Sequence, residues 1–194
     1  MQATVQTDVA GKRKLAKYSR GEMATRIGWV LGAQLFRLSP RPLWGFRNAL
    51  LRLFGARVGR AVRVHPSVEI IIPWTLTLDD EVTVGHRAIL YGLGPIRIGA
   101  RATISQNAHL CAGTHDFADP KFKLLKPPVS IGEDAWICAD AFVGPNVTVG
   151  AGAVVGARAV AVKDVSPWMI AAGNPAKPLR SRELRAPDAN LSDP

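Results

Sequence analysis

The sequence is poor in cysteine and has no long apolar run, and each absence excludes a class of protein. Its two cysteines, Cys111 and Cys138, form no closely spaced pair, which excludes a disulfide framework and the common zinc and redox motifs. We expect both to be buried thiols of a protein from a reducing compartment. No run of about 18 apolar residues occurs, so no membrane-spanning helix is predicted. The opening residues also lack the apolar core of a signal peptide, and we expect a cytoplasmic protein.

Acidic residues are scarce in the first third of the 194-residue chain. Residues 1–63 carry thirteen lysines and arginines but only two acids, Asp8 and Glu22, whereas residues 64–194 carry twelve basic and thirteen acidic residues. A nucleic-acid-binding domain would spread its basic charge over the folded face that meets the phosphates. We therefore expect no nucleic-acid partner. The length allows one main domain with a modest appendage.

What the chain does contain is an aliphatic residue at every sixth position. The longest uninterrupted series runs through residues 131–166, and shorter series that are shifted by two residues precede it. Small or β-branched residues often lie four positions after each aliphatic, and glycine often follows it directly. The longest series consists of Ile131, Ile137, Val143, Val149, Val155 and Ala161.

A period of six matches neither a helix nor a simple strand, but it is typical of a solenoid. Each short strand points one aliphatic side chain inward, a turn follows, and three strands close one triangular coil. The aliphatics stack from coil to coil into a continuous core. The small residue fits the crowded corner, and glycine, asparagine or aspartate tolerates the left-handed geometry of the turn. The fold class predicted is an all-β solenoid of hexapeptide repeats.

The repeat divides the chain into three parts. Residues 1–56 form a basic, partly helical segment, of which residues 1–24 are expected to be disordered. Residues 57–166 form the solenoid, interrupted by a loop at residues 113–128. Residues 167–194 form a cap and tail, in which Gly173 to Leu184 is expected to contain a short helix that covers the last coil.

Several motifs resemble those of the hexapeptide-repeat sugar O-acetyltransferases, and most of all the colanic-acid-type exopolysaccharide enzymes within the maltose, galactoside and nodulation-factor group. The similarity spans roughly residues 50–180 and rests on "ISQNAHLCAGTHDFADP", "IGEDAWICADAFVGPNVTVGAGAVVGARAVAVKDV" and "AAGNPAKPLR". This resemblance implies a left-handed β-helix, a homotrimer and acetyl-coenzyme A as acetyl donor. It also implies a sugar or lipid-linked glycan as acceptor and no metal cofactor.

His115 lies in the loop that interrupts the repeat and matches the general-base histidine of that family. A sugar hydroxyl is a poor nucleophile until its proton is removed, and an imidazole titrates near working pH. From the residues alone, a surface loop histidine without a catalytic role is the favoured interpretation. Asp116 has two roles open, either orienting the imidazole or capping the loop through backbone N–H groups. Glu133 and Asp134 are rival orienting groups.

Further positions correspond to donor and acceptor contacts in the family, and each has a structural alternative. Asn107 is either an acceptor contact or a left-handed turn residue. The maltose and galactoside enzymes have an Asn-rich stretch where this chain reads "ILYGLGPIRIG", so Tyr91 is the candidate acceptor contact there. Trp136 either packs against the pantetheine arm of the ligand or packs into a subunit contact.

The expected coenzyme A site also rests on the resemblance. Ala139 and Ala157 match small residues beside the pantetheine arm, or they serve solenoid packing alone. Lys163, Lys177 and Arg180 match basic positions near the nucleotide phosphates, where charge-assisted hydrogen bonds orient the ligand. Exposed cations that are simply solvated are the alternative for these three. The remaining histidines, His65, His86 and His109, are expected to be exposed.

The N-terminal third combines aromatic, leucine and arginine residues in two stretches with helical spacing. Trp29 and Leu35 belong to the first, and Leu43 to Phe54 forms the second, with Arg47 and Arg52 on its polar side. The helices either cover the first coil or contact the membrane surface, where arginines meet anionic headgroups. Both roles are compatible.

The predicted function is therefore O-acetyl transfer to a sugar hydroxyl by direct transfer, with His115 as general base. No serine nucleophile motif is present to favour an acyl-enzyme. The alternatives are transfer to serine or an antibiotic, a noncatalytic scaffold, and a carbonic-anhydrase-like metal trimer. The four histidines of the sequence are poorly spaced for the last.

Overall fold

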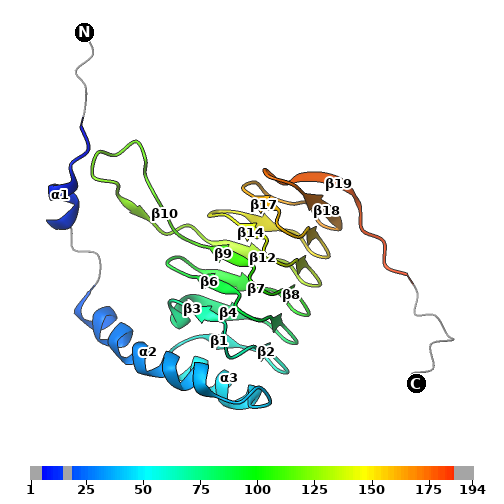
Figure 1. The fold of residues 1–194 in the computed structure, drawn as a ribbon, viewed down its shortest axis with the longest axis horizontal. Helices are drawn as coiled ribbons and strands as arrows, with labels where there is room; N and C mark the ends of the chain where they lie inside the picture. The colour runs from blue at the N-terminus through cyan, green and yellow to red at the C-terminus, as the bar shows by residue number, and fades with distance from the viewer. Residues whose placement is uncertain (1–5, 15–18, 186–194) are drawn as a thin grey trace, which may run out of the picture.

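The computed structural model describes residues 6–14 and 19–185 and shows a parallel β-solenoid with helices at one end. The coils stack one above the other, and α2 and α3 lie beneath the first of them (Figure 1). Three sheets, here named A, B and C, form the three sides. Sheet A contains β1 (Arg57–Val58), β4 (Leu76–Leu78), β7 (Ile96–Ile98), β12 (Val129–Ile131) and β15 (Thr148–Val149).

The other two sheets complete each coil, so that the chain passes from sheet A to B to C and back. Sheet B contains β2 (Arg63–Val64), β5 (Thr83–Val84), β8 (Thr103–Ile104), β13 (Trp136–Ile137), β16 (Val154–Val155), β18 (Met169–Ala172) and β19 (Lys177–Ser181). Sheet C contains β3 (Glu69–Ile70), β6 (Ile89–Tyr91), β9 (His109–Cys111), β14 (Phe142–Val143) and β17 (Val160–Ala161). The predicted solenoid is confirmed.

The core consists of the aliphatics that the six-residue period predicts. Ile104 pairs with Ile137, and Ile137 with Val155, in neighbouring coils of sheet B, and all three side chains are fully buried. The small residues four positions further on, such as Ala108 and Ala141, are buried at the corners. Burying one such aliphatic is worth about 2 kcal/mol, and the stacking repeats this gain in every coil.

The corners differ from the prediction in the residues that adopt left-handed geometry. Asn107 and Asp134 have positive φ as expected, but so do Glu81, Arg101 and Arg158. Left-handed geometry costs a non-glycine residue about 1–2 kcal/mol. A hydrogen bond between coils offsets this cost, because the backbone N–H at the corner donates to a carbonyl of the preceding coil. The N–H of Arg101, for example, donates to the carbonyl of Asp80 at 2.9 Å.

All departures from the regular repeat occur at one corner, between sheets C and A. Val58 pairs with Leu78 and Leu78 with Ile98, a spacing of 20 residues, whereas Ile131 pairs with Val149, a spacing of 18. The additional residues include the 3-10 helix η1 (Pro73–Thr75), which directly precedes β4. The long insertion that carries His115 leaves from the same corner, between β9 and β12.

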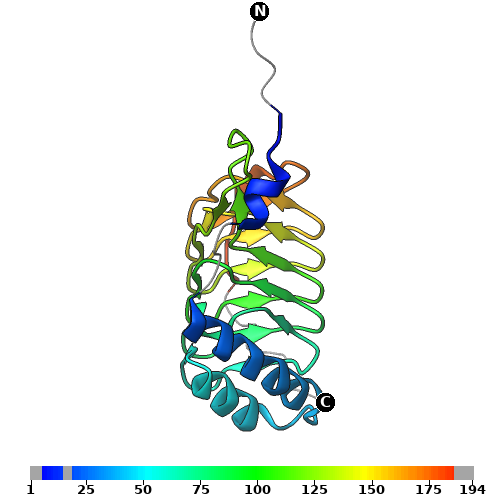
Figure 2. The same ribbon diagram turned by 90° about the vertical axis from the view of Figure 1, so that its left-hand side faces the viewer.

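Helices α2 (Arg20–Leu38) and α3 (Trp44–Leu53) cover the open end of the first coil, as one of the two interpretations of the N-terminal third predicted (Figure 2). Ser19 caps α2, since its side chain accepts the N–H of Glu22. Leu50 and Leu51 of α3 are buried in the same core as the solenoid aliphatics. The two helices and the solenoid therefore share one hydrophobic core.

Side chains of α3 satisfy the carbonyl groups that the first coil leaves open. Arg52 donates to Val58 of β1 at 2.8 Å, and the Nε of Arg47 donates to Val64 of β2 at 2.8 Å. The prediction that Arg47 lies on the polar side of its helix is wrong, because the side chain is completely buried. Its guanidinium also donates to the Ser39 hydroxyl and to two turn carbonyls, so each of its nitrogens has a partner.

Two further donors complete the cover of this edge. The Asn48 amide donates to Val62 at 2.9 Å, and the buried Trp29 indole donates from α2 to Ile70 of β3 at 2.8 Å. Each strand of the first coil thus has a carbonyl bound by a helix side chain instead of a further strand. Unpaired buried carbonyl groups are costly, which explains why polar side chains are buried here.

The two ends of the chain differ from the predictions. Helix α1 (Val9–Lys14) and the first turn of α2 lie within the stretch expected to be disordered, while residues 1–5 and 15–18 lie outside the described residues. The cap contains no helix among its described residues. Instead β19 pairs antiparallel with β18, and Arg182 binds the carbonyls of Asp134 and Gly152.

None of the helices in residues 6–14 and 19–185 has the length and apolar character needed to cross a bilayer.

Candidate functional site

The candidate site is built on a hairpin that projects from the corner between sheets C and A (Figure 1). Strands β10 (Thr114–His115) and β11 (Leu124–Leu125) pair antiparallel, with His115 opposite Leu124. The hairpin interrupts the repeat because it must leave the solenoid side and return to it. A loop on a rigid scaffold is a typical place for functional side chains.

His115 is exposed on this hairpin and is held through one ring nitrogen. Its Nδ1 lies 2.7 Å from the carbonyl oxygen of Phe122. A carbonyl can only accept, so Nδ1 carries the hydrogen and donates it. In the neutral ring the lone pair then belongs to Nε2, which faces away from this contact and is able to accept a proton.

The carboxylate of Asp116 does not orient the imidazole in this structure. Its Oδ1 accepts the backbone N–H of Ala118 at 3.0 Å, which is the loop-capping alternative of the sequence analysis. Asp119 acts in the same way on Lys121 at 2.9 Å. The two aspartates shape the hairpin tip, and the Phe122 carbonyl takes the orienting role.

Glu133 and Asp134, the rival orienting groups, face a different corner. Both accept hydrogen bonds from Arg101, at 3.1 Å and 2.7 Å respectively. The hydrogen bond and charge of Arg101 lower the pKa of Asp134. These carboxylates join two coils across the A–B corner and are engaged there, not at the imidazole.

The positions expected to hold coenzyme A are accessible, but they lie on different edges of the protomer. Ala139 and Ala157 occupy the B–C corner of successive coils, where the N–H of Arg158 donates to the Ala139 carbonyl at 2.9 Å, and Ala157 is exposed. Lys163 is exposed after β17 at the C–A corner. Lys177 and Arg180 are exposed on β19 at the end of sheet B.

The three candidate acceptor contacts are likewise spread over the surface. Asn107 adopts φ 56° at the B–C corner, which is the turn role. Tyr91 is half-buried on sheet C, with its ring 6.2 Å from the ring of His109. Trp136 is exposed on sheet B and donates to the hydroxyl of Ser105 at 2.8 Å.

Two of the other histidines are less exposed than predicted. His109 is packed between Tyr91 and Phe142, and burial lowers its pKa. His65 is half-buried and linked to the exposed His86 through Ser67, with its pKa also lowered, first by burial. Within residues 6–14 and 19–185, no three His, Cys, Asp or Glu side chains are grouped to share a metal ion.

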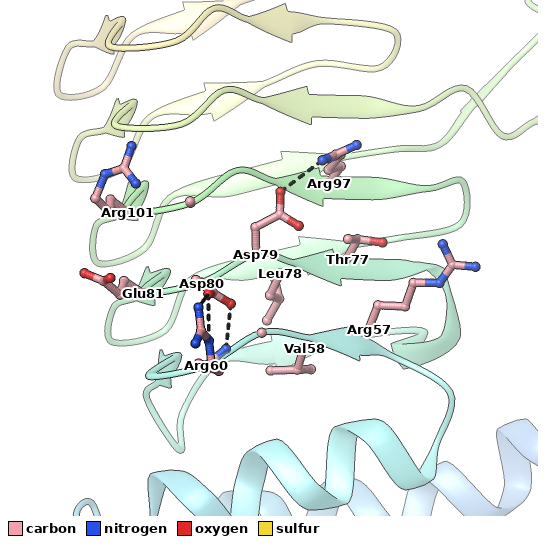
Figure 3. A pocket seen from close by; sticks show the side chains of 12 residues that line it. Arg57, Val58, Arg60, Thr77, Leu78, Asp79, Asp80, Glu81, Arg97 and Arg101 are labelled. Atoms are coloured by element: carbon pink, nitrogen blue, oxygen red, sulfur yellow. Dashed lines mark hydrogen bonds and ion pairs between the residues drawn. The ribbon is translucent and has the colours of Figure 1, made fainter.

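The structure adds one cleft that the sequence did not predict. A hollow of about 860 Å³ lies on sheet A over the lower coils, and His115 does not line it. Arg57 and Arg97 line it, together with the ion pairs Arg97–Asp79 and Arg60–Asp80 (Figure 3). The signal was present in the sequence as Arg57 and Arg97, which can be placed on either side of Thr77 in one row of sheet A only once the 20-residue register is known.

Comparison with known proteins connects these features to a family. Residues 128–161 match the family described as bacterial transferase hexapeptide (six repeats). The chain is 45% identical over 157 residues to WcaF of Escherichia coli, which is named as a colanic acid biosynthesis acetyltransferase, and the match covers 81% of this chain and 86% of WcaF.

Two solved structures share the fold. A hexapeptide-repeat acetyltransferase of Vibrio cholerae, complexed with acetyl-coenzyme A, has a TM-score of 0.80 at 24% identity and covers 87% of this chain and 93% of its own. A maltose O-acetyltransferase of Clostridium difficile has a TM-score of 0.78 at 22% identity and covers 86% and 90%. The predicted left-handed parallel β-helix is confirmed.

Proposed function

Since the chain belongs to the hexapeptide-repeat acetyltransferases, we propose that it transfers an acetyl group from acetyl-coenzyme A to a hydroxyl of a sugar acceptor. WcaF is named for colanic acid biosynthesis, which supports a glycan, either free or lipid-linked, as the acceptor class. The donor follows from the Vibrio cholerae structure, which was solved with acetyl-coenzyme A. We place the reaction in the cytoplasm.

The observation that carries the mechanism is the contact between His115 Nδ1 and the Phe122 carbonyl. This contact fixes the tautomer in which Nε2 is the base. Nε2 takes the hydroxyl proton as the sugar oxygen bonds to the acetyl carbon, the carbon–sulfur bond then breaks, and the proton passes to the departing thiolate. The transfer is direct, and the protein contributes mainly alignment of the hydroxyl with the thioester.

Asp116 contributes to catalysis by holding the hairpin tip that presents this carbonyl. Its hydrogen bond to Ala118 lies in the same turn as Phe122, whose own N–H donates to the carbonyl of Asp119 at 2.8 Å. The role is one of positioning, because the carboxylate acts through the backbone and not on the reacting atoms.

The exposed cations at the C-terminal coils fit the anionic end of coenzyme A. Lys163, Lys177 and Arg180 have their charged ends in solvent, where they are free to form charge-assisted bonds with phosphates. Ala139 and Ala157 leave the B–C corner without bulky side chains, so that the pantetheine arm can lie against the backbone. Comparing the KM for acetyl-coenzyme A with that for its 3′-dephospho form in Lys177→Ala and Arg180→Ala tests the phosphate contact.

A homotrimer would bring these dispersed positions together. His115, Ala157 and Lys163 lie on two different corners of one protomer, so a single site needs a neighbouring copy to face the hairpin. Sheet C offers a surface for the contact, with the rings of Tyr91 and Phe142 on either side of His109. In the trimer, Asn107, Tyr91 and Trp136 are the candidate acceptor contacts. Light scattering that gives the mass of one chain would contradict this assembly.

The proposed function is tested with His115→Ala and His115→Asn in an acetyl-transfer assay. The asparagine amide can still donate to the Phe122 carbonyl but cannot act as a base. This variant therefore distinguishes an effect of losing the loop's hydrogen bond from an effect of losing the base. We expect both variants to lose about 100- to 10,000-fold in kcat, while His86→Asn, on the solenoid, retains turnover.

Assaying acetyl transfer to a series of different acceptors distinguishes the proposed function from its alternatives. Turnover with mono- and oligosaccharides supports the proposal, and turnover only with serine or an antibiotic replaces the acceptor class. If no acceptor raises turnover above the background hydrolysis of acetyl-coenzyme A, and the protein does not bind acetyl-coenzyme A, the protein is a noncatalytic scaffold.

A further inference from the structure

Helix α2 has two apolar faces, and only one of them packs against the solenoid. Trp29 and Phe36, seven residues apart, form the buried face. The opposite face carries large apolar side chains at spacings of three and four residues. Its members and their exposed fractions are Met23 (46%), Ile27 (64%), Val30 (61%), Leu31 (70%), Leu35 (56%) and Leu38 (79%).

Helix α3 also carries exposed apolar side chains. Phe46 and Leu53, seven residues apart and so on one side of the helix, are 45% and 79% exposed. Buried Leu51 occupies the other side, and buried Leu50 lies between the two sides. The two neighbouring helices at the base of the molecule (Figure 2) therefore both present apolar side chains outward. Clusters of exposed apolar side chains on a protein surface mark an interaction surface.

The charge around this surface is predominantly positive. Residues 19–63 contain nine arginines and one acid, Glu22, and Glu22 is paired with Arg26 at 3.3 Å. Arg37 lies in the last turn of α2 and Arg41 in the turn that follows, and both are exposed. The apolar face is thus bordered by an excess of cations, and the exposed Glu69 of β3, which lies beside Val30 and Arg37, offsets it only in part.

We propose that the outward faces of α2 and α3 dock the protein on an anionic lipid bilayer. A helix with an apolar face and bordering arginines lies in the plane of the headgroups, with its apolar side chains in the acyl boundary and its cations among lipid phosphates. The 19 residues of α2 form a rod about 28 Å long, long enough to lie along the surface.

The structure favours lipid over a second copy of the chain as the occupant. A second copy would bring the same arginines face to face, and like charges oppose such a contact. The docking also needs no unfolding, because the Trp29 indole and the Arg52 guanidinium hold both helices on the first coil from their other side. The surface forms a fixed, preorganised platform. This inference is independent of the proposed reaction.

The test is flotation of the full chain with vesicles of phosphatidylglycerol and phosphatidylcholine in equal parts, against vesicles of phosphatidylcholine alone. We expect binding to the anionic vesicles that weakens as salt rises. The double variant Ile27→Glu, Leu31→Glu places two carboxylates on the docking face and should lower the partition coefficient at least tenfold. Leu179→Glu, at an equally exposed leucine on β19, is the matched control and should bind like the parent.

A second pair of variants tests the arginines. Arg37→Ala with Arg41→Ala should weaken binding by about fivefold per arginine removed, whereas Arg158→Ala, at an exposed corner of the upper coils, should not. Equal flotation of the parent and the double glutamate variant would overturn the proposal. So would a fall in the mass of the assembly caused by the glutamates without lipid, because it would show that another copy covers this face. Thermal unfolding of each variant shows that the fold is intact.

Discussion

The carboxylate of Asp116 accepts the backbone N–H of Ala118 at 3.0 Å, one residue away from the imidazole that it does not touch. The residue next to the proposed base thus braces the turn. The imidazole is oriented by a main-chain carbonyl at Phe122, which no substitution of a side chain removes directly.

The first prediction concerns Asp116. Asp116→Asn keeps an oxygen that can accept the Ala118 N–H, so we expect turnover within about threefold of the parent, whereas Asp116→Ala frees the turn and should lower kcat by about tenfold, the effect of a lost turn contact worth about 1.4 kcal/mol. Steady-state kinetics measure both. If Asp116→Asn is as inactive as His115→Ala, the carboxylate charge acts on the imidazole and the positioning role is wrong.

The second prediction concerns Arg47. Arg47→Ala leaves the carbonyl of Val64 and the turn acceptors buried without a donor, each at a cost of about 1 kcal/mol or more, so we expect the free energy of unfolding to fall by about 3 kcal/mol. Arg47→Lys, which cannot reach all the acceptors, should lose less. Urea unfolding at fixed protein concentration measures the change.

Arg63→Ala, at an exposed arginine of β2, is the control and should be near neutral. A loss at Arg47→Ala no larger than this control would show that water replaces the guanidinium at the first coil.

The third prediction concerns His109 and pH. Burial between the two rings lowers the pKa of His109, and the charge of Glu69 opposes this only partly. In the unfolded chain the group titrates near its ordinary 6.5. Below that pH the unfolded state binds more protons than the folded state, so the free energy of unfolding decreases as the pH falls from about 6.5 through the folded-state pKa. Above about pH 6.5 this group has no effect on stability.

His109→Phe should make this decrease shallower, because phenylalanine fills the same space and does not titrate. Melting temperatures between about pH 5 and 8 measure the slope, and His65, whose pKa is also lowered, should account for part of what remains. Superimposable pH profiles of the variant and the parent would contradict the assignment.

The fourth prediction concerns the small residues of the B–C corner. Ala157 is exposed while Ala159, two positions on, is fully buried. We expect Ala157→Leu to raise the KM for acetyl-coenzyme A about tenfold with an unchanged melting temperature. Ala159→Leu should instead destabilise the fold by about 1–3 kcal/mol or more through overpacking. An unchanged KM in Ala157→Leu would remove this corner from the donor site.

The sequence predicted the solenoid well because its core repeats one simple requirement. Ile131, Ile137 and Val143 each fill the same inward position, so a period of six is visible without any long-range information. The inserted loop was also predictable, because residues that break the period, such as His115, cannot belong to a coil, but its pairing as a hairpin was not predicted.

Other features depend on contacts between distant residues and were not predictable from local pattern. Arg47 occupies a position that helical spacing does not distinguish from a solvated one, and only the open edge at Val64 makes it a buried donor. The partner of His115 is a carbonyl, which every residue has. The cap became a strand because β18 offers a free edge that Lys177 to Ser181 can pair with.

A stack of parallel coils has no intrinsic length, since each coil is a template for the next. At the first coil, side-chain donors bind the carbonyl groups with which a further strand would pair, so no strand can be added there. These donors are Arg52, Arg47, Asn48 and Trp29. The number of coils is thereby fixed from that end. Removing the segment before residue 57 would expose three strand edges at once, and the shortened protein should self-associate through these edges.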